Sequence, residues 1–203
     1  MTVITTPTPD TLDVSLFGIV PHLDILSRLM LLQSHNGRFP IAHTKSRSAR
    51  RGSTRKLTKQ KGAGASRKGS NRSPSRKGGG VAFGPRSNAN FHIGMNAQER
   101  RLGLASALTL KNQEDRIRVI DKIDSKTAVM AKTFADITKD STALVFISAL
   151  ESKKVSGLDN IHGTHVDVVT HASPAEILKY DYCVFTQEAL KDLSEHFISA
   201  YNN

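Results

Sequence analysis

The C-terminal half of the chain alternates between short, almost wholly apolar runs and longer amphipathic stretches. The apolar runs predict strands at residues 116–120, 143–148, 166–169 and 182–185. The stretches between them predict a helix at residues 126–137, one or two helical turns at 152–158, a short helix from Ser173 and a helix from Thr186 to about Tyr201. Such alternation is typical of a parallel sheet covered on both faces. We therefore predict an α/β fold, a Rossmann-like, three-layer globular domain on a parallel sheet.

Two of these helices have recognisable start signals. Ser173-Pro174-Ala175-Glu176 has the spacing of a capping box, with proline at the first helical position. Thr186 is a residue type that caps helix N-termini, and we expect it to cap the last helix.

The N-terminal half contains two further helical patterns separated by a long aperiodic stretch. Residues 23–33 have the apolar spacing of a helix with one broad buried face, and the second pattern begins at Asn96 and continues through Leu110. Residues 38–92 show neither the period of a strand nor that of a helix. We therefore predict a globular body, residues 1–42 and 87–203, with a long extended loop inserted at residues 43–86, called the basic loop below.

The positive charge of the chain is concentrated in and around this loop. The net charge is +11, yet the 74 residues from Ile25 to Gln98 contain 16 lysines and arginines and no acidic residue. The rest of the chain has 13 basic and 18 acidic residues. A mildly acidic body with one strongly cationic segment indicates a polyanionic partner.

Three features distinguish the basic loop from a flexible linker, the alternative that its Gly, Ser, Lys and Arg content also fits. It lies between two helices that look core-forming, where a structureless loop of this length is uncommon unless it is functional. Its glycines cluster, as in Gly78-Gly79-Gly80, which suits positive φ angles and close approach to another surface. Its cations alternate with Ser, Thr and Asn, which can donate to phosphate and ribose oxygens. We predict that it is mobile when free and takes its shape from RNA, because no helix suited to a DNA groove is present.

Other candidate chemistry is weak. Gly64-x4-Gly69-Ser70 approaches a phosphate-binding loop but lacks its lysine and a preceding strand. His162, His165 and His171 have no zinc-site spacing, and Cys183 lies in a predicted buried strand, where a thiol is usually inert. We therefore predict no cofactor, no metal and no catalytic residue. The single cysteine and the absence of a leader pattern or a membrane-length apolar run favour a cytoplasmic protein without a membrane partner.

Several motifs of the chain resemble those of a known family. In the loop they are Gln60-Lys61-Gly62-Ala63-Gly64, Arg67-x-Gly69-Ser70-x-Arg72-Ser73-Pro74 and Gly78-Gly79-Gly80-Val81-x-Phe83-Gly84-Pro85. Outside these runs they are Thr44-Lys45-Ser46-Arg47, the helix 100–108, Lys126-Thr127 and the region 178–190. Over residues 16–200 the chain resembles the universal large-subunit ribosomal protein four family.

The resemblance implies a structural protein of the large ribosomal subunit, not an enzyme, in cytoplasmic ribosomes, with the ribosomes of an organelle as the alternative. It implies that the basic loop binds large-subunit rRNA, supports subunit assembly and lines part of the nascent-polypeptide exit tunnel. The expected partners are that rRNA, neighbouring proteins including protein twenty-two at the tunnel constriction, and the nascent polypeptide. No small-molecule substrate is expected. Leu57, Ala63 and Ala65 depart from the family pattern, and these departures alter the expected tunnel geometry.

The predicted RNA-binding residues all lie in the basic loop. The cations, which would neutralise phosphate, are Lys45, Arg47, Arg50, Arg51, Arg55, Lys56, Lys59, Lys61, Arg67, Lys68, Arg72, Arg76, Lys77 and Arg86. The glycines, which would permit close packing on RNA, are Gly62, Gly64, Gly69, Gly78, Gly79, Gly80 and Gly84. The remaining polar and turn residues are Gln60, Ser70, Ser73 and Pro74. Phe83 is expected to pack or stack at the base of the loop.

Two other functions fit parts of the sequence. An α/β enzyme would use the basic insertion to hold an anionic substrate, with polar groups at the carboxyl ends of its strands. The candidates at those positions are Asp121, Asp124, Glu151, His171 and Thr186. A free RNA chaperone would also use the loop, but its body would have no fixed place in an assembly.

Overall fold

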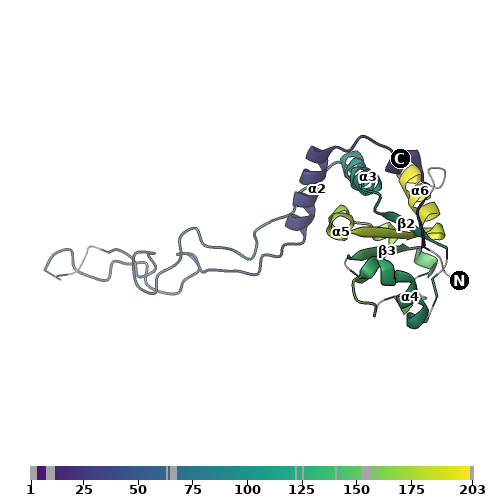
Figure 1. Cartoon of the computed structure of the whole chain (residues 1–203). Helices are drawn as coiled ribbons and strands as arrows, with labels where there is room; N and C mark the ends of the chain where they lie inside the picture. The colour runs from purple at the N-terminus through teal and green to yellow at the C-terminus, as the bar shows by residue number, and fades with distance from the viewer. Residues whose placement is uncertain are drawn as a thin grey trace. The chain divides into compact units, whose positions relative to one another are not determined.

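The computed structural model of the chain describes residues 4–7, 12–62, 64, 68–121, 123–124, 126–139, 141–151, 157–158 and 160–201. The chain divides into two compact units (Figure 1). The first unit comprises residues 1–33 and 94–203, and the second comprises residues 34–93. The basic loop lies within the second unit.

The first unit is built on a five-stranded, mostly parallel sheet. Its strands are β1 (Ile4–Thr5), β2 (Ile117–Ile120), β3 (Ala143–Ile147), β4 (Thr164–Val168) and β5 (Tyr182–Thr186). The order in the sheet is β1-β2-β5-β3-β4, with β2, β5, β3 and β4 parallel and β1 antiparallel to β2. The α/β class and the four strands predicted from apolar runs are therefore confirmed.

Two strands differ from the sequence prediction by more than one residue at an end. β4 begins at Thr164 rather than at Val166, because Thr164 and His165 pair in register with the first two residues of β3. β4 lies at the edge of the sheet and is partly exposed, so polar residues occur at its start. A prediction from apolar residues alone therefore made this strand too short. Val169 falls outside the strand, in a short 3-10 helix (Val169–His171). β1 was not predicted, since two residues are too few to show a period.

The helices are α1 (Val14–Phe17), α2 (Leu23–Asn36), α3 (Ala97–Gln113), α4 (Thr127–Thr138), α5 (Pro174–Lys179) and α6 (Gln187–Tyr201). The five helices predicted at or after residues 23, 96, 126, 173 and 186 are confirmed; α1 was not predicted. Of the turns predicted at 152–158, residues 152–156 lie outside the described residues. Among the helices described, none has the length and apolar content required to cross a membrane.

One of the two predicted helix start signals works as expected. Thr186 accepts a hydrogen bond at Oγ1 from the N–H of Ala189 (3.1 Å), three residues into the turn, as a capping side chain does. Ser173 occupies the N-cap position of α5 with Pro174 next to it, but its side chain makes no capping bond. The spacing therefore places Ser173 and Pro174 correctly, but the capping hydrogen bond that a capping box implies is absent at Ser173.

Apolar side chains cover both faces of the sheet. On β3, Leu144 and Phe146 belong to one buried cluster, whereas Val145 and Ile147 belong to another. The first cluster includes side chains of α3, α5 and α6, and Phe146 stacks on Phe185 of β5 at 5.0 Å between ring centres. The second is closed by α4 (Figure 1). This continuous burial explains why β3 reads as an uninterrupted apolar run.

Helices α2 and α3, which precede and follow the second unit in the chain, are packed closely within the first unit. A Cβ atom at Gly103 of α3 would lie 2.6 Å from Cδ2 of Leu29 on α2. Gly103 therefore allows Leu29, which is buried, to press against the α3 backbone. This contact ties the two helices to the same hydrophobic core.

Candidate nucleic-acid interface

The second unit has no strand, and no helix beyond the end of α2, among its described residues. Its two arms, which lead to and from the loop tip, are nevertheless joined by hydrogen bonds. The Asn36 side chain donates from Nδ2 to the carbonyl of Ile93 (3.3 Å) and accepts its N–H at Oδ1 (2.9 Å). The guanidinium of Arg38 lies 4.4 Å from the centre of the Phe91 ring. These contacts join the two arms at the ends that are farthest from the loop tip along the chain.

A second group of contacts, called the brace below, joins residues 43–45 to residues 81–87. The N–H of Thr44 donates to the carbonyl of Pro85 (2.9 Å), and its hydroxyl donates to the same oxygen (3.1 Å). The N–H of Val81 donates to the carbonyl of Lys45 (2.9 Å). The N–H of Ser87 donates to Nδ1 of His43 (3.2 Å). The brace holds the two arms together with backbone groups on both sides.

Further along the arms, side chains bridge to the opposite backbone. Arg72 donates from Nε to the carbonyl of Gly52 (2.7 Å), and the hydroxyl of Ser70 donates to the carbonyl of Ser53 (2.9 Å). Residues roughly equidistant from the tip are thus paired, as in a hairpin without a β-ladder. Arg and Ser side chains thus satisfy carbonyl groups that a β-ladder would otherwise pair.

Two of the predicted RNA-binding glycines, Gly80 and Gly84, pack closely within the chain. A Cβ atom at Gly80 would lie 2.5 Å from the N of Arg47, and one at Gly84 would lie 2.1 Å from Oγ1 of Thr44. These two glycines permit close approach to the opposite arm of the same chain. Gly62 and Gly64 have positive φ angles (78° and 62°), and a Cβ atom at either would have no neighbour within 4 Å, so their space stays open to another molecule.

The predicted RNA-binding residues differ in how much of their surface is available. The exposed ones are Lys45, Arg47, Arg51, Arg55, Lys56, Lys59, Gln60, Lys61, Gly62, Gly64, Gly69, Pro74, Lys77, Gly78, Phe83 and Arg86. The partly buried ones are Arg50, Lys68, Ser70, Arg72, Ser73, Arg76, Gly79 and Gly84, and Gly80 is buried. Arg67 lies outside the described residues.

Some of the partly buried cations are used inside the second unit. Arg76 donates from Nη2 to the carbonyl of Lys68 (3.1 Å), and Arg72 bridges to Gly52 as described above. Both arginines therefore contribute to the shape of the segment, whatever they contact outside it. The exposed cations carry most of the charge that remains free for a partner.

None of these cations has a carboxylate neighbour in its own segment, because residues 25–98 contain no acidic residue. The ion pairs that the described structure shows all lie in the first unit. The field of the second unit is therefore uncompensated, which favours an anionic polymer as its ligand.

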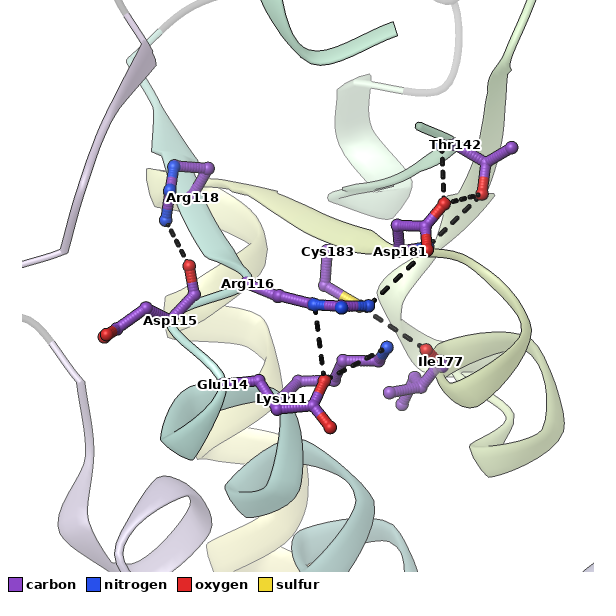
Figure 2. Close-up of polar contacts among 9 residues, drawn as sticks. All are labelled: Lys111, Glu114, Asp115, Arg116, Arg118, Thr142, Ile177, Asp181 and Cys183. Carbon is purple, nitrogen blue, oxygen red and sulfur yellow. Dashed lines mark hydrogen bonds and ion pairs between the residues drawn. The ribbon is translucent and has the colours of Figure 1, made fainter. Parts of the chain in front are cut away.

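The first unit, in contrast, uses its charges internally, as Figure 2 shows at the amino ends of β2, β3 and β5. Arg116 lies between Glu114 and Asp181, at 3.5 Å from each carboxylate. Asp181 accepts at Oδ2 from the N–H (2.9 Å) and the hydroxyl (3.0 Å) of Thr142. The backbone bond from Thr142, followed by its hydroxyl, lowers the pKa of Asp181. Buried Lys111 lies 3.9 Å from the Glu114 carboxylate.

The polar groups considered for an enzyme are held in similar structural contacts. Thr186 donates to Oε2 of buried Glu151 (2.8 Å), which lies near the N–H of Ser148 (3.4 Å). Asp121 accepts from the side chain of Gln187 (2.7 Å), and the N–H of Asp124 lies 3.2 Å from the sulfur of Met130. The contacts of Glu151 and Asp121 join the segments that follow β3 and β2 to the end of β5 and the start of α6, and the Asp124 contact joins the segment after β2 to α4.

The histidines and the cysteine show no sign of a metal site. In the described part of the chain, no three His, Cys, Asp or Glu side chains are placed to hold a metal ion. His165 stacks on the ring of Tyr180 at 5.6 Å, and His171 ends the 3-10 helix after β4. Cys183 is buried, and burial raises the pKa of its thiol to about 12, so the reactive thiolate is suppressed.

Sequence reasoning missed several residues that pair the two arms of the second unit. Asn36, Thr44, Ser53 and Pro85 are not among the predicted RNA-binding residues, yet each pairs across the two arms. The sequence carries little signal for these pairs, because the acceptors at Ile93, Pro85 and Ser53 are backbone carbonyls, which any residue type supplies. The pairs use mixed side-chain and backbone groups, so no apolar periodicity reveals them.

Comparison with known proteins gives consistent matches along the chain. Residues 11–196 match the model of the ribosomal protein L4/L1 family. The large ribosomal subunit protein uL4 of Brevibacillus brevis is 32% identical over 184 residues, covering 89% of this chain and 88% of the relative. The proteins of the same name from Rhizorhabdus wittichii (34% over 185 residues, 89% and 88%) and Pelobacter propionicus (35% over 179 residues, 84% of each) match similarly.

Proposed function

Because the chain belongs to the ribosomal protein L4/L1 family, we propose that it is a structural constituent of the large ribosomal subunit that binds large-subunit rRNA. The family makes it a ribosomal protein and not an enzyme. We place it in ribosomes of the cytoplasm.

The observation that carries the RNA-binding proposal is the uncompensated charge of the second unit. Its 43–86 region presents exposed cations on two braced arms, and no acidic residue occurs between Ile25 and Gln98. Phosphate neutralisation by such cations releases counterions and supplies most of the affinity for nucleic acid. The serine, threonine and asparagine residues between them add donors for phosphate and sugar oxygens.

The proposal assigns different tasks to the two units. The first unit would be the anchor, and its Rossmann-like, three-layer character is supported by helices on both faces of a mostly parallel sheet. Its strand order, with β5 between β2 and β3, differs from the usual Rossmann order. The second unit would be the long inserted loop that enters folded rRNA during subunit assembly.

We further propose that the tip of the loop lines part of the nascent-polypeptide exit tunnel, near the large-subunit protein twenty-two. The open, positive-φ positions of Gly62 and Gly64 support close approach to RNA or to a passing peptide there. Leu57, Ala63 and Ala65 would then shape this chain's own version of the constriction.

The test is sedimentation of ribosomal subunits from cells that express the tagged full chain or a variant in which a short Gly-Ser link replaces residues 43–86. The full chain is expected to migrate with the large subunit in high salt. The shortened chain is expected to stay at the top of the gradient, with a folded first unit by circular dichroism. A full chain found only in the free pool, as a free RNA chaperone would be, contradicts the proposal. So does a shortened chain that enters subunits as well as the full one.

A further inference from the structure

Phe83 combines two properties that rarely occur together in one residue. Its φ angle is +53°, in the left-handed region that bulky side chains seldom adopt, and its exposed area is 108% of the reference value. A ring that served packing would be covered by its neighbours. Backbone strain of this kind persists only where surrounding contacts impose it, and it clusters at functional sites.

The brace supplies those surrounding contacts. On one side of Phe83, the N–H of Val81 bonds to the carbonyl of Lys45, and on the other side Pro85 accepts two hydrogen bonds from Thr44. Gly84, directly after Phe83, has no room for a side chain, because a Cβ atom there would overlap Thr44 Oγ1. Phe83 is therefore held between two points at which its arm is bonded to the opposite arm, and its ring is exposed to solvent.

The chemistry around the ring favours one class of partner. Lys45, Arg47 and Arg86, which belong to or flank the brace, are exposed cations. No carboxylate is available in this segment to neutralise them. An exposed aromatic ring in a segment that carries exposed cations is the arrangement with which proteins stack unpaired bases. A protein partner with an apolar pocket would gain little from these charges.

We propose that Phe83 is a preformed platform on which one unpaired RNA base stacks while Lys45, Arg47 and Arg86 bind neighbouring phosphates. The proposal rests on the RNA-binding function proposed above and adds a single nucleotide-binding position to it. Of the two roles expected from the sequence, packing and stacking, the exposure of the ring favours stacking.

The chain offers a direct optical test, because it contains no tryptophan. Phe83→Trp in the full chain introduces one indole, whose fluorescence is expected to be quenched when a 12-nucleotide oligoadenylate stacks on it. An oligomer with the same number of phosphates but no bases is expected to bind without this quenching. Phe39→Trp is the matched control, since Phe39 is also exposed (77%) in the second unit but has no positive φ. Equal quenching at both positions, or by both oligomers, overturns the proposal.

Affinity gives an independent readout. Phe83→Asn removes the ring but keeps a residue that tolerates positive φ, so the brace should persist. It is expected to weaken oligoadenylate binding by about tenfold, with no change for the abasic oligomer or in the salt dependence. An equal loss on both oligomers, or no loss, rejects the platform.

The two proposals fail in different ways. If the unaltered chain binds both oligomers equally and in a salt-dependent manner, only the proposal of base stacking on Phe83 is rejected. If it binds neither oligomer nor large-subunit rRNA, both the RNA-binding function and base stacking on Phe83 are rejected.

Discussion

In the first unit Arg116 lies between two carboxylates, and Thr186 binds Glu151, so charged and polar groups are satisfied within the fold. In the second unit, Arg72 and Arg76 bond to backbone carbonyls, and most of the other cations are exposed, with no acidic residue in the segment. Charged residues thus stabilise the fold in the first unit, whereas most cations of the second unit are exposed and available to bind a partner. Polar residues indicate a binding surface here only where the fold leaves their charge unbalanced.

The two units also obtain their shape by different means. The first unit depends on two apolar clusters that sandwich a sheet. The second unit depends on hydrogen bonds between its arms, at Asn36, Thr44 and Gly52 among others, with exposed apolar side chains such as Ile41 (89%). We therefore expect its contacts to open more readily than those of the sheet, and to be completed by a bound partner.

The largest expected effect comes from removing exposed charge from the second unit. Five glutamine substitutions, at Arg47, Arg51, Arg55, Lys56 and Lys59, should make the salt dependence of RNA binding shallower by about 4 in log–log slope, with an affinity loss on the order of a thousandfold. Filter binding of large-subunit rRNA across a salt series measures both quantities.

The matched control removes the same number of positive charges from the first unit. In it, five exposed lysines are changed to glutamine, at Lys126, Lys132, Lys139, Lys179 and Lys191. These substitutions should leave the slope nearly unchanged. If the two sets have the same effect, the contrast between the units is wrong, because net charge alone would then account for binding.

A smaller but still large effect is expected for the core of the first unit. Phe134 of α4 is fully buried, so Phe134→Ala should reduce the free energy of unfolding by about 3–5 kcal/mol. Urea unfolding measures the loss. Phe39→Ala, at an exposed position of the second unit, should change it by less than about 0.5 kcal/mol. Comparable losses from the two substitutions would show that the second unit has an apolar core of its own.

The smallest expected effect is a dependence of stability on pH. Hydrogen bonds from the Thr142 backbone and hydroxyl hold the pKa of Asp181 below its usual range. The ionised Asp181 therefore stabilises the fold above the ordinary aspartate pKa, and this contribution is lost as pH falls through the lowered value. Because Asp181 is at the surface, the effect is small.

Unfolding in urea at about pH 7 and about pH 3 tests this. Asp181→Asn should lower stability at the higher pH and reduce the difference between the two, and Thr142→Ala, which keeps the backbone N–H, should do so only in part. An Asp181→Asn variant whose stability has the same pH dependence as the unaltered chain would show that the contacts of Asp181 in Figure 2 do not contribute to stability.

Much of the first unit could be predicted because its elements have strong local patterns. β3 is an uninterrupted apolar run, and Thr186 caps α6 through a contact only three residues away. β1 could not be predicted, because it exists only through pairing with β2, more than a hundred residues later. Ser173 shows the limit of a motif, since its local spacing was right but its side chain makes no capping hydrogen bond.

For the candidate interface, the sequence predicted the location and charge but not the geometry. Composition alone separates residues 43–86 from the rest of the chain. The different roles within that set depend on contacts across the arms, which place Gly80 against the backbone of Arg47 and Gly84 against the side chain of Thr44. The left-handed backbone at Phe83 likewise arises from the brace and not from any preference of phenylalanine.

The central claim is that the second unit, and not the first, forms the principal contact with RNA. Ultraviolet crosslinking of the chain within purified large subunits, followed by mass spectrometry of the peptide–RNA adducts, tests it most directly. Adducts are predicted to concentrate in residues 43–86, with Phe83 among them. Adducts confined to residues 1–33 and 94–203 would contradict the account.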